Sequence, residues 1–278
     1  MNPVIKYRGG KSRDLDKFIK YIPAAYDRYI EPFLGGGALF FFLEPRTAIL
    51  NDRNKKLINF YKQLRDEYPA IRAELDALRE IYERNQRKFR KMKSERPGER
   101  AINENEKLYY RMRDIFNHPT TEFLEGSVYF FINKTAYSGM IRYNRRGEYN
   151  VPFGRYENFN SGLATEAHSR LLRSSRIYNS DYSEIFNKAR SADFMFLDPP
   201  YDCVFNDYGD AEFNEDEHRR LFGDFKNLAC RALMVIGKTS LTTELYKNFI
   251  CDEYHKRYAV NIRNRFKNES AHIVIKNY

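Results

Sequence analysis

The 278-residue sequence contains no tryptophan and only three cysteines, and long hydrophobic runs are missing as well. Cys203, Cys230 and Cys251 are widely spaced, so they form neither a metal-binding pair nor an even disulfide framework, and this pattern favours a reducing compartment. Because no run of about 18 apolar residues occurs, the sequence predicts no membrane-spanning helix. The first 11 residues contain three basic side chains and no apolar core, a pattern that is not typical of a secretory signal.

Phenylalanine and tyrosine are abundant, with 22 residues of each, so these rings must fill much of the core in place of tryptophan. The 48 Lys and Arg residues outnumber the 38 Asp and Glu residues and give a formal net charge of +10. Such an excess is typical of a protein that binds a polyanion, because each neutralised phosphate releases a counterion. A basic protein with no nucleic-acid partner fits the number equally well, since net charge describes association and not fold.

The N-terminal part of the chain predicts alternating helices and strands. Apolar residues at helical spacing follow Ser12, and residues 29–33 then form a short apolar run that leads into the glycines at 35–37. Residues 38–43 are typical of a helix, and residues 48–50 of a second buried strand. We therefore expect a strand, a glycine loop, a helix and a strand in that order, which is the start of an α/β fold.

Alternation then stops, and helical periodicity with dense charge predicts an inserted, mostly helical domain. Within it, residues 143–153 predict a β-hairpin whose turn contains Gly147. We expect this insert to span residues 57–159, and we expect the α/β domain to be built from residues 1–56 and 160–278.

Short apolar runs at residues 177–179, 194–197 and 233–236 predict buried parallel strands in the C-terminal part. Residues 258–262 and 273–275 are expected to form a closing antiparallel pair. Together with the N-terminal strands, these runs predict a Rossmann-like sheet.

The sharpest chemical signal is Asp198-Pro199-Pro200-Tyr201, which directly follows the predicted strand at 194–197. Two successive prolines fix φ and have no backbone N–H, so the carbonyl groups around them can accept hydrogen bonds from another molecule. Asp198 adds a carboxylate at the carboxyl end of a strand, where open α/β sheets place their ligands, and Tyr201 adds a stacking ring. These groups suit an aromatic amine, a weak nucleophile that positioning and electrostatics can activate. A simple turn at a strand end is the alternative for so short a motif.

A second signal is the glycine loop Glu31-Pro32-Phe33-Leu34-Gly35-Gly36-Gly37 between a predicted strand and a predicted helix. Glycines let a ligand approach the backbone closely, and an acidic residue about 20 positions on can hold ribose hydroxyls. Asp52 follows at a similar distance, at the end of the next predicted strand. The loop lacks the spaced glycines of a dinucleotide site and the Lys-Ser/Thr of a phosphate-binding loop. The pattern therefore favours a nucleoside cofactor without a pyrophosphate.

A third block, Lys6-Tyr7-Arg8-Gly9-Gly10-Lys11, is weak on its own. In their combination and order, the three blocks resemble the Dam family of DNA adenine methyltransferases. The segment 133–156, with its ending Asn150-Val151-Pro152-Phe153-Gly154-Arg155-Tyr156, strengthens the resemblance, which covers nearly the whole chain. It implies an S-adenosylmethionine-dependent methyltransferase of α/β fold, with a Rossmann-like sheet and an inserted target-recognition domain. The implied reaction is methyl transfer to adenine N6 in duplex DNA after base flipping.

The same resemblance implies the roles of individual residues. The catalytic block comprises Asp198, Pro199, Pro200 and Tyr201. The residues implied in S-adenosylmethionine binding are Tyr7, Lys11, Phe33, Gly35, Gly37, Asp52, Asp181, Tyr182 and Asp198. The residues implied in DNA binding are Lys6, Tyr137, Ser138, Met140, Arg142, Asn144, Arg145, Arg146, Pro152, Arg155 and Tyr156. No metal ion is expected.

Within the DNA-binding set, Lys6 and Arg142 match residues that bind guanine in relatives, and Tyr137 and Ser138 match a pair that probes the duplex beside the flipped base. Ser138 stands where a relative carries Asn, and Tyr7 stands where many relatives carry Trp. The first departure leaves open which contacts fill the space vacated by the base, whereas a tyrosine can still stack.

We expect 5′-GATC-3′ as the recognition sequence. Arginine can bind guanine O6 and N7 bidentately in the major groove, and Met140 and Pro152 are apolar residues suited to a thymine methyl group. The alternative for Arg142 is a contact to phosphate, because half or more of protein–DNA hydrogen bonds go to the backbone.

Several other functions compete with this expectation. Methyltransferases that act on protein glutamine carry Asn in place of Asp198, and those that act on cytosine N4 usually carry Ser. An RNA adenine methyltransferase would find no readable major groove for a basic hairpin. A catalytically silent, sequence-specific DNA-binding protein is the alternative from another class.

Double-stranded DNA is the expected partner, and no membrane is involved. We expect a monomer, or a dimer on DNA, in the cytoplasm of a bacterial or phage system. A restriction endonuclease of the same specificity would be a functional partner and not a physical one.

Overall fold

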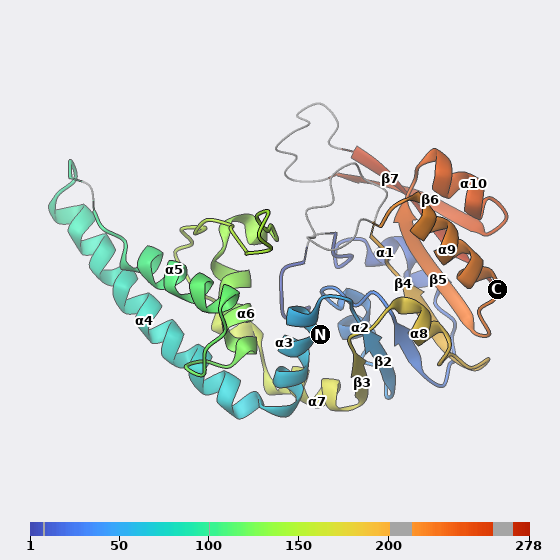
Figure 1. Cartoon of the computed structure of the whole chain (residues 1–278), viewed down its shortest axis with the longest axis horizontal. Helices are drawn as coiled ribbons and strands as arrows, with labels where there is room; N and C mark the ends of the chain where they lie inside the picture. The colour runs from blue at the N-terminus through green and yellow to red at the C-terminus, as the bar shows by residue number, and fades with distance from the viewer. Residues whose placement is uncertain (8, 100, 201–212, 258–268) are drawn as a thin grey trace. The chain divides into compact units, whose positions relative to one another are not determined.

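A computed structural model describes residues 1–7, 9–99, 101–200, 213–257 and 269–278 (Figure 1). The chain divides into two compact units. Unit 1 contains Met1–Gly10 and Asn54–Arg173, and unit 2 contains Lys11–Arg53 and most of residues 174–278.

Unit 2 is built on a seven-stranded sheet with the order β3-β2-β1-β4-β5-β7-β6. The strands are β1 (Tyr29–Glu31), β2 (Ala48–Asn51), β3 (Ser175–Tyr178), β4 (Phe194–Leu197), β5 (Arg231–Gly237), β6 (Ile250–Arg257) and β7 (Glu269–Lys276). The first five strands are parallel, and β7 pairs antiparallel with both β5 and β6. The predicted Rossmann-like α/β fold is confirmed. Because β1 has β2 on one side and β4 on the other, the strand order reverses between them, which is where such sheets bind ligands.

Helices cover both faces of this sheet. Alternate residues of its strands, such as Met195 and Leu197 of β4, pack in one apolar cluster with α8 (Tyr182–Phe186), α9 (Glu215–Lys226) and α10 (Ser240–Tyr246). The intervening residues face the other side, because successive strand side chains alternate. There Phe196 stacks on Phe18 of α1 (Leu15–Phe18), and Tyr29 lies near Phe40 of α2 (Ala38–Leu43).

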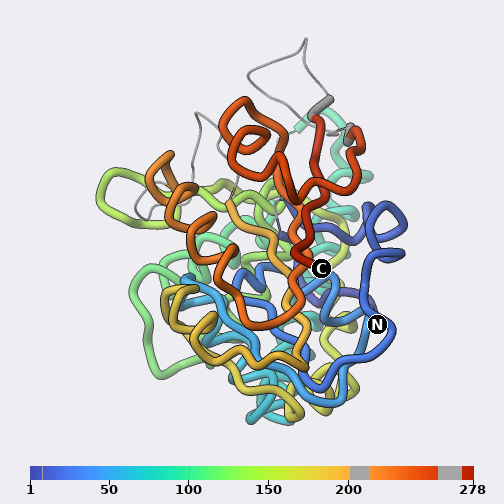
Figure 2. Tube along the Cα trace, turned by 90° about the vertical axis from the view of Figure 1, so that its right-hand side faces the viewer, coloured from blue at the N-terminus to red at the C-terminus, as the bar shows by residue number. Residues whose placement is uncertain are grey.

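The antiparallel edge differs from expectation. The sequence predicts that residues 258–262 pair with the last strand, but they lie outside the described residues. In the structure, the edge strand beside β7 is β6, which comes earlier in the chain. The chain ends directly after β7, at the point marked C in Figure 2. Asn277 accepts from the backbone N–H of Ala232 (2.8 Å) and donates to the carbonyl oxygen of Cys230 (3.0 Å).

Unit 1 is helical. It contains α3 (Lys55–Asp66), α4 (Tyr68–Glu95), α5 (Glu104–Asn117), α6 (Glu125–Thr135), α7 (Glu166–Arg173) and the 3₁₀ turns η2 (Tyr137–Gly139) and η3 (Ser161–Leu163), while η1 (Ile19–Tyr21) belongs to unit 2. All residues of α6 after its first are buried. The sequence explains this position, since α6 is apolar on every side and must be surrounded by other helices. No helix in the described part of the chain is long and apolar enough to cross a membrane.

The predicted β-hairpin at 143–153 is a tight antiparallel loop that contains no regular strand. Isolated bridges pair Tyr143 with Tyr149 and Ala136 with Phe153. Its turn contains Gly147 at φ 77°, as expected. A side chain of α5 replaces a further strand here. Asn117 accepts from the N–H of Tyr149 (2.8 Å) and donates to its carbonyl oxygen (3.1 Å).

The compact units also differ from the expected domain limits, because residues 1–10 and 160–173 belong to unit 1. Both segments are held there by side chains that bond to backbone groups. Asn133 of α6 bonds to the N–H and the carbonyl oxygen of Lys6 (2.8 and 2.7 Å), and Arg72 of α4 donates to the carbonyl oxygen of Ser161 (2.9 Å). Such long-range bonds leave no mark in sequence periodicity.

Arg28 provides a test of what stabilises unit 2. Its Nε donates to Oδ1 of Asp193 (2.9 Å), its Nη2 donates to Oδ2, and Asp193 is only 1% exposed. Arg28→Ala would leave a buried carboxylate without its cation, so we expect the free energy of unfolding in urea to fall by about 3–5 kcal/mol. Lys17→Ala removes the partner of Asp16 on the exposed surface and should change the free energy of unfolding far less. Equal losses in the two variants would contradict this assignment.

Candidate active site

Three carboxyl groups lie at the carboxyl edge of the parallel strands of unit 2. Glu31 is the last residue of β1, Asp52 directly follows β2, and Asp198 directly follows β4. These strands are neighbours in the sheet, so the three groups share the edge where the strand order reverses.

Asp198 forms an ion pair with Lys11, whose ammonium group contacts Oδ1. Lys11 is 1% exposed and the Asp198 side chain is 21% exposed, so the lysine is inside the protein and the carboxylate reaches its surface. A buried ammonium group requires a paired acid, because its desolvation is costly. The ion pair with Lys11 therefore fixes the orientation of the Asp198 carboxylate at the end of β4. Pro199 is buried and Pro200 partly buried behind it.

Glu31 is a functional candidate to which the sequence interpretation assigned no role of its own. Burial raises the pKa of its carboxyl group well above the ordinary value, and the negative charges of Asp198 and Asp52 raise it further. The hydroxyl of Tyr29, which donates to Oε2 (2.8 Å), acts in the opposite direction. The raised pKa favours the protonated, neutral form of Glu31. No sequence signal could reveal this, because the effect depends on three strands lying side by side.

The glycine loop connects β1 to α2. Gly37 precedes α2 with φ 65°, and a Cβ there would lie 3.0–3.1 Å from the ring of Phe41, so a side chain does not fit. The backbone N–H of Gly35 donates to Oδ2 of Asp52 (2.8 Å). The structure thus brings the predicted loop glycines and the predicted ribose-binding acid into direct contact.

Asn51 is a second residue that the sequence interpretation left without a role. It is 1% exposed and its amide group donates to the carbonyl oxygens of Pro32 (2.9 Å) and Ser180 (3.0 Å). Its Oδ1 accepts from the N–H of Ser180 (2.9 Å). One side chain therefore joins the glycine loop to the loop before α8. The only sequence signal is its position beside Asp52 at a strand end.

Asp181 and Tyr182 begin α8. The carboxylate of Asp181 accepts from the N–H and hydroxyl of Ser183 (3.0 and 2.7 Å) and pairs with Arg220 of α9. Burial alone would raise the pKa of Asp181, but Arg220 and Ser183 outweigh it and lower the pKa. The Tyr182 ring lies 5.2 Å from that of Phe33, and the Arg220 guanidinium lies 4.8 Å from the Tyr182 ring. An ionised acid and a pair of rings thus lie together beside the glycine loop.

The residues implied in DNA binding all belong to unit 1, and so does Tyr7. The backbone of Lys6 is bonded to Asn133, and its ammonium group lies 4.2 Å from the ring centre of Tyr156. The backbone N–H of Tyr137 donates to the carbonyl oxygen of Pro152 (2.9 Å). Four of the predicted DNA-binding residues are therefore neighbours in space although they come from three parts of the sequence.

The loop between Tyr137 and Pro152 presents basic side chains. Arg142, Arg145 and Arg146 are exposed, as is Arg155 beyond it. Asn150 holds the guanidinium of Arg142, whose Nε donates to its Oδ1 (2.7 Å) and whose Nη2 donates to its carbonyl oxygen (3.1 Å).

Other members of the DNA-binding set have different surroundings. Asn144 accepts from the N–H groups of Arg146 (2.9 Å) and Glu148 (3.0 Å), so its carbonyl side shapes the turn. Tyr137 is 48% exposed, Ser138 is exposed with φ 53°, and Met140 is partly buried. Tyr201 of the catalytic block lies outside the described residues.

Lys134 of α6 is a basic residue that the sequence interpretation missed. It is 7% exposed, and burial together with the charge of Lys6 lowers its pKa to about 8. Its position within an apolar helix next to Asn133 was the available signal.

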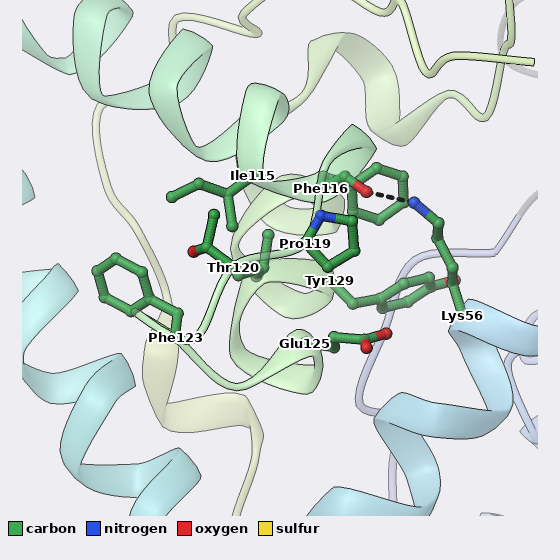
Figure 3. A pocket seen from close by; sticks show the side chains of 9 residues that line it. Lys56, Ile115, Phe116, Pro119, Thr120, Phe123, Glu125 and Tyr129 are labelled. Atoms are coloured by element: carbon green, nitrogen blue, oxygen red, sulfur yellow. Dashed lines mark hydrogen bonds between the residues drawn. The ribbon is translucent and has the colours of Figure 1, made fainter.

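A pocket in unit 1 contains none of the predicted site residues (Figure 3). Lys56 lines it, donates to the carbonyl oxygen of Phe116 and lies 3.9 Å from that ring. Burial lowers the pKa of Lys56, and Glu125 across the pocket partly offsets this effect. The lysine satisfies a carbonyl group at the end of α5, so this pocket is a helix terminus covered by a side chain.

The mostly parallel sheet with its antiparallel β7 and the acidic, glycine-lined edge are those of a Rossmann-like methyltransferase. A family model described as D12 class N6 adenine-specific DNA methyltransferase matches residues 7–261, and the chain belongs to that family. It is therefore an adenine-specific DNA methyltransferase.

Relatives of the chain agree with this family. The type II methyltransferase M.CviBI of Paramecium bursaria Chlorella virus NC1A is 35% identical, and the similarity covers 100% of both chains. The type II methyltransferase M.MjaIII of Methanocaldococcus jannaschii is 28% identical over 100% of this chain and 99% of the relative. A DNA adenine methylase of Salmonella typhi is 28% identical over 87% of this chain and 83% of the relative.

The raised pKa of Glu31 has a measurable consequence. A carboxyl group whose pKa is raised by folding contributes stability below its ordinary pKa and loses it as the pH rises through the raised value. Glu31→Gln keeps the size of the neutral group and cannot ionise, so its stability relative to the wild type should increase from pH 5 to pH 8. Urea unfolding across this range measures it, with the exposed Glu80→Gln as the control. Parallel pH profiles for Glu31→Gln and the wild type would contradict the assignment.

Proposed function

We propose that the chain transfers a methyl group from S-adenosylmethionine to N6 of an adenine flipped out of duplex DNA, within the sequence 5′-GATC-3′. The observation that carries this proposal is the position of Asp198-Pro199-Pro200 at the carboxyl end of β4, with Asp198 held by the buried Lys11.

The residues of unit 2 suit a nucleoside cofactor. Gly35 and Gly37 carry no side chains of their own, so the loop backbone is open to a close ligand, and the Asp52 carboxylate is fixed by the N–H of Gly35. The rings of Phe33 and Tyr182 and the ionised Asp181 offer apolar surface and an acceptor for an adenine. S-adenosylmethionine supplies an electrophilic methyl group when bound.

Asp198 and the proline carbonyl groups would accept the two N–H groups of the target amine. Oδ1 of Asp198 already accepts from Lys11, but a carboxylate has about four acceptor positions, so the group can serve both partners. Accepting both N–H groups directs the nitrogen lone pair out of the ring plane and raises its nucleophilicity. Asp198 is also placed to receive the proton that the nitrogen loses once it is methylated.

Unit 1 would bind the DNA. Arg142, held by Asn150, offers a planar guanidinium of fixed orientation, which suits guanine O6 and N7. Lys6 would bind the guanine of the other strand. Exposed Tyr137, followed by Ser138 in a left-handed conformation, would fill the space beside the flipped adenine.

The names of the relatives suggest the cellular setting. Two of them are type II methyltransferases, so we propose that the chain protects DNA from an endonuclease that it does not need to contact. We also propose that it acts as a monomer, or a dimer on DNA, in the cytoplasm of a bacterial or phage-infected cell.

The experiment that tests the proposal is methyl transfer to a 5′-GATC-3′ duplex, with single-base substitutions in the site, single-stranded DNA and RNA as comparisons. N6-methyladenine should form only in the GATC duplex. Methylation at another sequence would refute the proposed specificity, and methylation of RNA or of cytosine would refute the proposed substrate.

The role of Asp198 is tested by Asp198→Asn, which keeps the size of the side chain beside Lys11. We expect turnover to fall at least about 100-fold, because the lower end of the contribution of a positioned acid or base is of this order. Because Asp198 also belongs to the residues implied in S-adenosylmethionine binding, cofactor affinity is measured by calorimetry and turnover is compared at saturating cofactor. A variant that retains most of its turnover would refute the catalytic role.

The role of Arg142 is tested by Arg142→Ala on GATC and on duplexes with one substituted guanine. If the side chain binds the base, discrimination at one guanine should weaken by about 1–3 kcal/mol. Arg145→Ala, on the same loop, should weaken binding evenly across the sequences. An even loss with Arg142→Ala would instead identify a phosphate contact.

A further inference from the structure

The distal half of α4 has no place in the function described so far. The buried residues of this helix are Ile71, Leu75, Leu78 and Tyr82, all in its first 15 residues. From residue 84 to residue 96 no residue is buried, and this stretch contains seven basic residues and one acidic residue. The helix therefore continues for more than three turns after its apolar face has ended.

Four of the basic residues form a stripe. Arg84, Arg87, Lys88 and Lys91 are spaced by three and four positions and fall within about 100° around the helix axis. All four are exposed, and in the described part of the chain no acid pairs with Arg84, Arg87 or Lys88, while Lys91 has a loose pair with Glu95 (3.7 Å). Like charges at this spacing repel one another, so the stripe weakens the isolated helix and favours a bound polyanion.

The segment implied in DNA binding contacts α4 on the helix face opposite the stripe. The hydroxyl of Tyr82 donates to the carbonyl oxygen of Tyr156, and Arg90 forms an ion pair with Glu157. Tyr156 in turn lies against Lys6. All these contacts are within unit 1, so the helix that carries the stripe is packed against the segment implied in DNA binding, and the stripe itself faces the solvent.

We propose that the stripe Arg84, Arg87, Lys88 and Lys91 binds the phosphate backbone of duplex DNA flanking the recognition sequence, with no preference for its bases. The inference rests on the proposed duplex substrate. Exposed Arg and Lys side chains on one helix face supply positive charge, but no neighbour among the described residues holds them in the fixed orientation that hydrogen bonds to a base require. Such side chains suit phosphate groups. Residues 82–95 span about 20 Å of helix, which corresponds to about six base pairs of duplex.

Duplexes of two lengths test the proposal. Both carry one central GATC site, with three flanking base pairs on each side in the short duplex and fifteen in the long one. The variant carries Arg84→Gln, Arg87→Gln, Lys88→Gln and Lys91→Gln, which keep the helix propensity of the segment. We expect it to bind the short duplex as the wild type does and the long duplex at least about 10-fold more weakly at low salt. The slope of log affinity against log salt on the long duplex should become shallower by about two to four.

The control variant removes four exposed lysines of unit 2, Lys17, Lys188, Lys226 and Lys247, by the same change to Gln. It loses the same charge and should keep the wild-type dependence on duplex length. The two double variants, Arg84→Gln with Lys88→Gln and Arg87→Gln with Lys91→Gln, should each lose part of the effect, so the test stands even if the fourfold change harms folding.

The outcomes separate this inference from the proposed function. An equal loss on both duplexes, or no loss on either, would overturn the role of the stripe. If the fourfold variant still bound long duplexes more tightly than short ones, the role of the stripe would also be overturned, and an acidic protein partner would be favoured instead. Failure of the wild type to methylate the long GATC duplex, despite binding it, would count against the proposed function and not against the stripe.

Discussion

The buried ammonium group of Lys11 is the constraint on which the catalytic edge depends. A lysine that is 1% exposed needs an acid, and Asp198 is that acid. The pair lies where Glu31 and Asp52 contribute further acidic groups. Burial raises the pKa of Glu31, and the negative charges of Asp198 and Asp52 raise it further. The three carboxyl groups at this sheet edge therefore have different environments. Asp198 is ion-paired, Asp52 accepts from a backbone N–H, and burial favours the neutral form of Glu31. Different environments give the same functional group different roles.

In both units, asparagine side chains hold loops in place through hydrogen bonds to the backbone. Asn51 joins the two loops beside the sheet edge, Asn117 holds the loop of basic residues, and Asn133 holds the N-terminal segment. Each amide bonds to backbone donors and acceptors as a neighbouring strand would, so irregular segments acquire fixed positions without regular secondary structure. Functional residues can then sit on loops whose own sequences are unconstrained by strand or helix formation.

The sequence predicted the parallel strands, the glycine loop and the position of Asp198, because buried strands and proline or glycine signals are local. It did not predict that residues 1–10 and 160–173 belong to the helical unit, since Asn133 and Arg72 reach them from more than 80 positions away. It predicted the turn at Gly147 but not the absence of regular strands around it, which depends on Asn117 of α5. The raised pKa of Glu31 could not be predicted for the same reason. It follows from burial and from the acids on two neighbouring strands, which no single segment of the sequence contains.

Two backbone hydrogen bonds lie at the base of the loop from Tyr137 to Pro152. The N–H of Tyr137 donates to the carbonyl oxygen of Pro152, and the N–H of Gly154 donates to that of Thr135 (2.8 Å). Since no side chain of the tip takes part in these two bonds, the tip can change its residues while the base keeps its geometry. Such a loop can diverge in sequence at its tip while the helices that carry it keep their positions, because loop tips tolerate change where the backbone at their base is bonded.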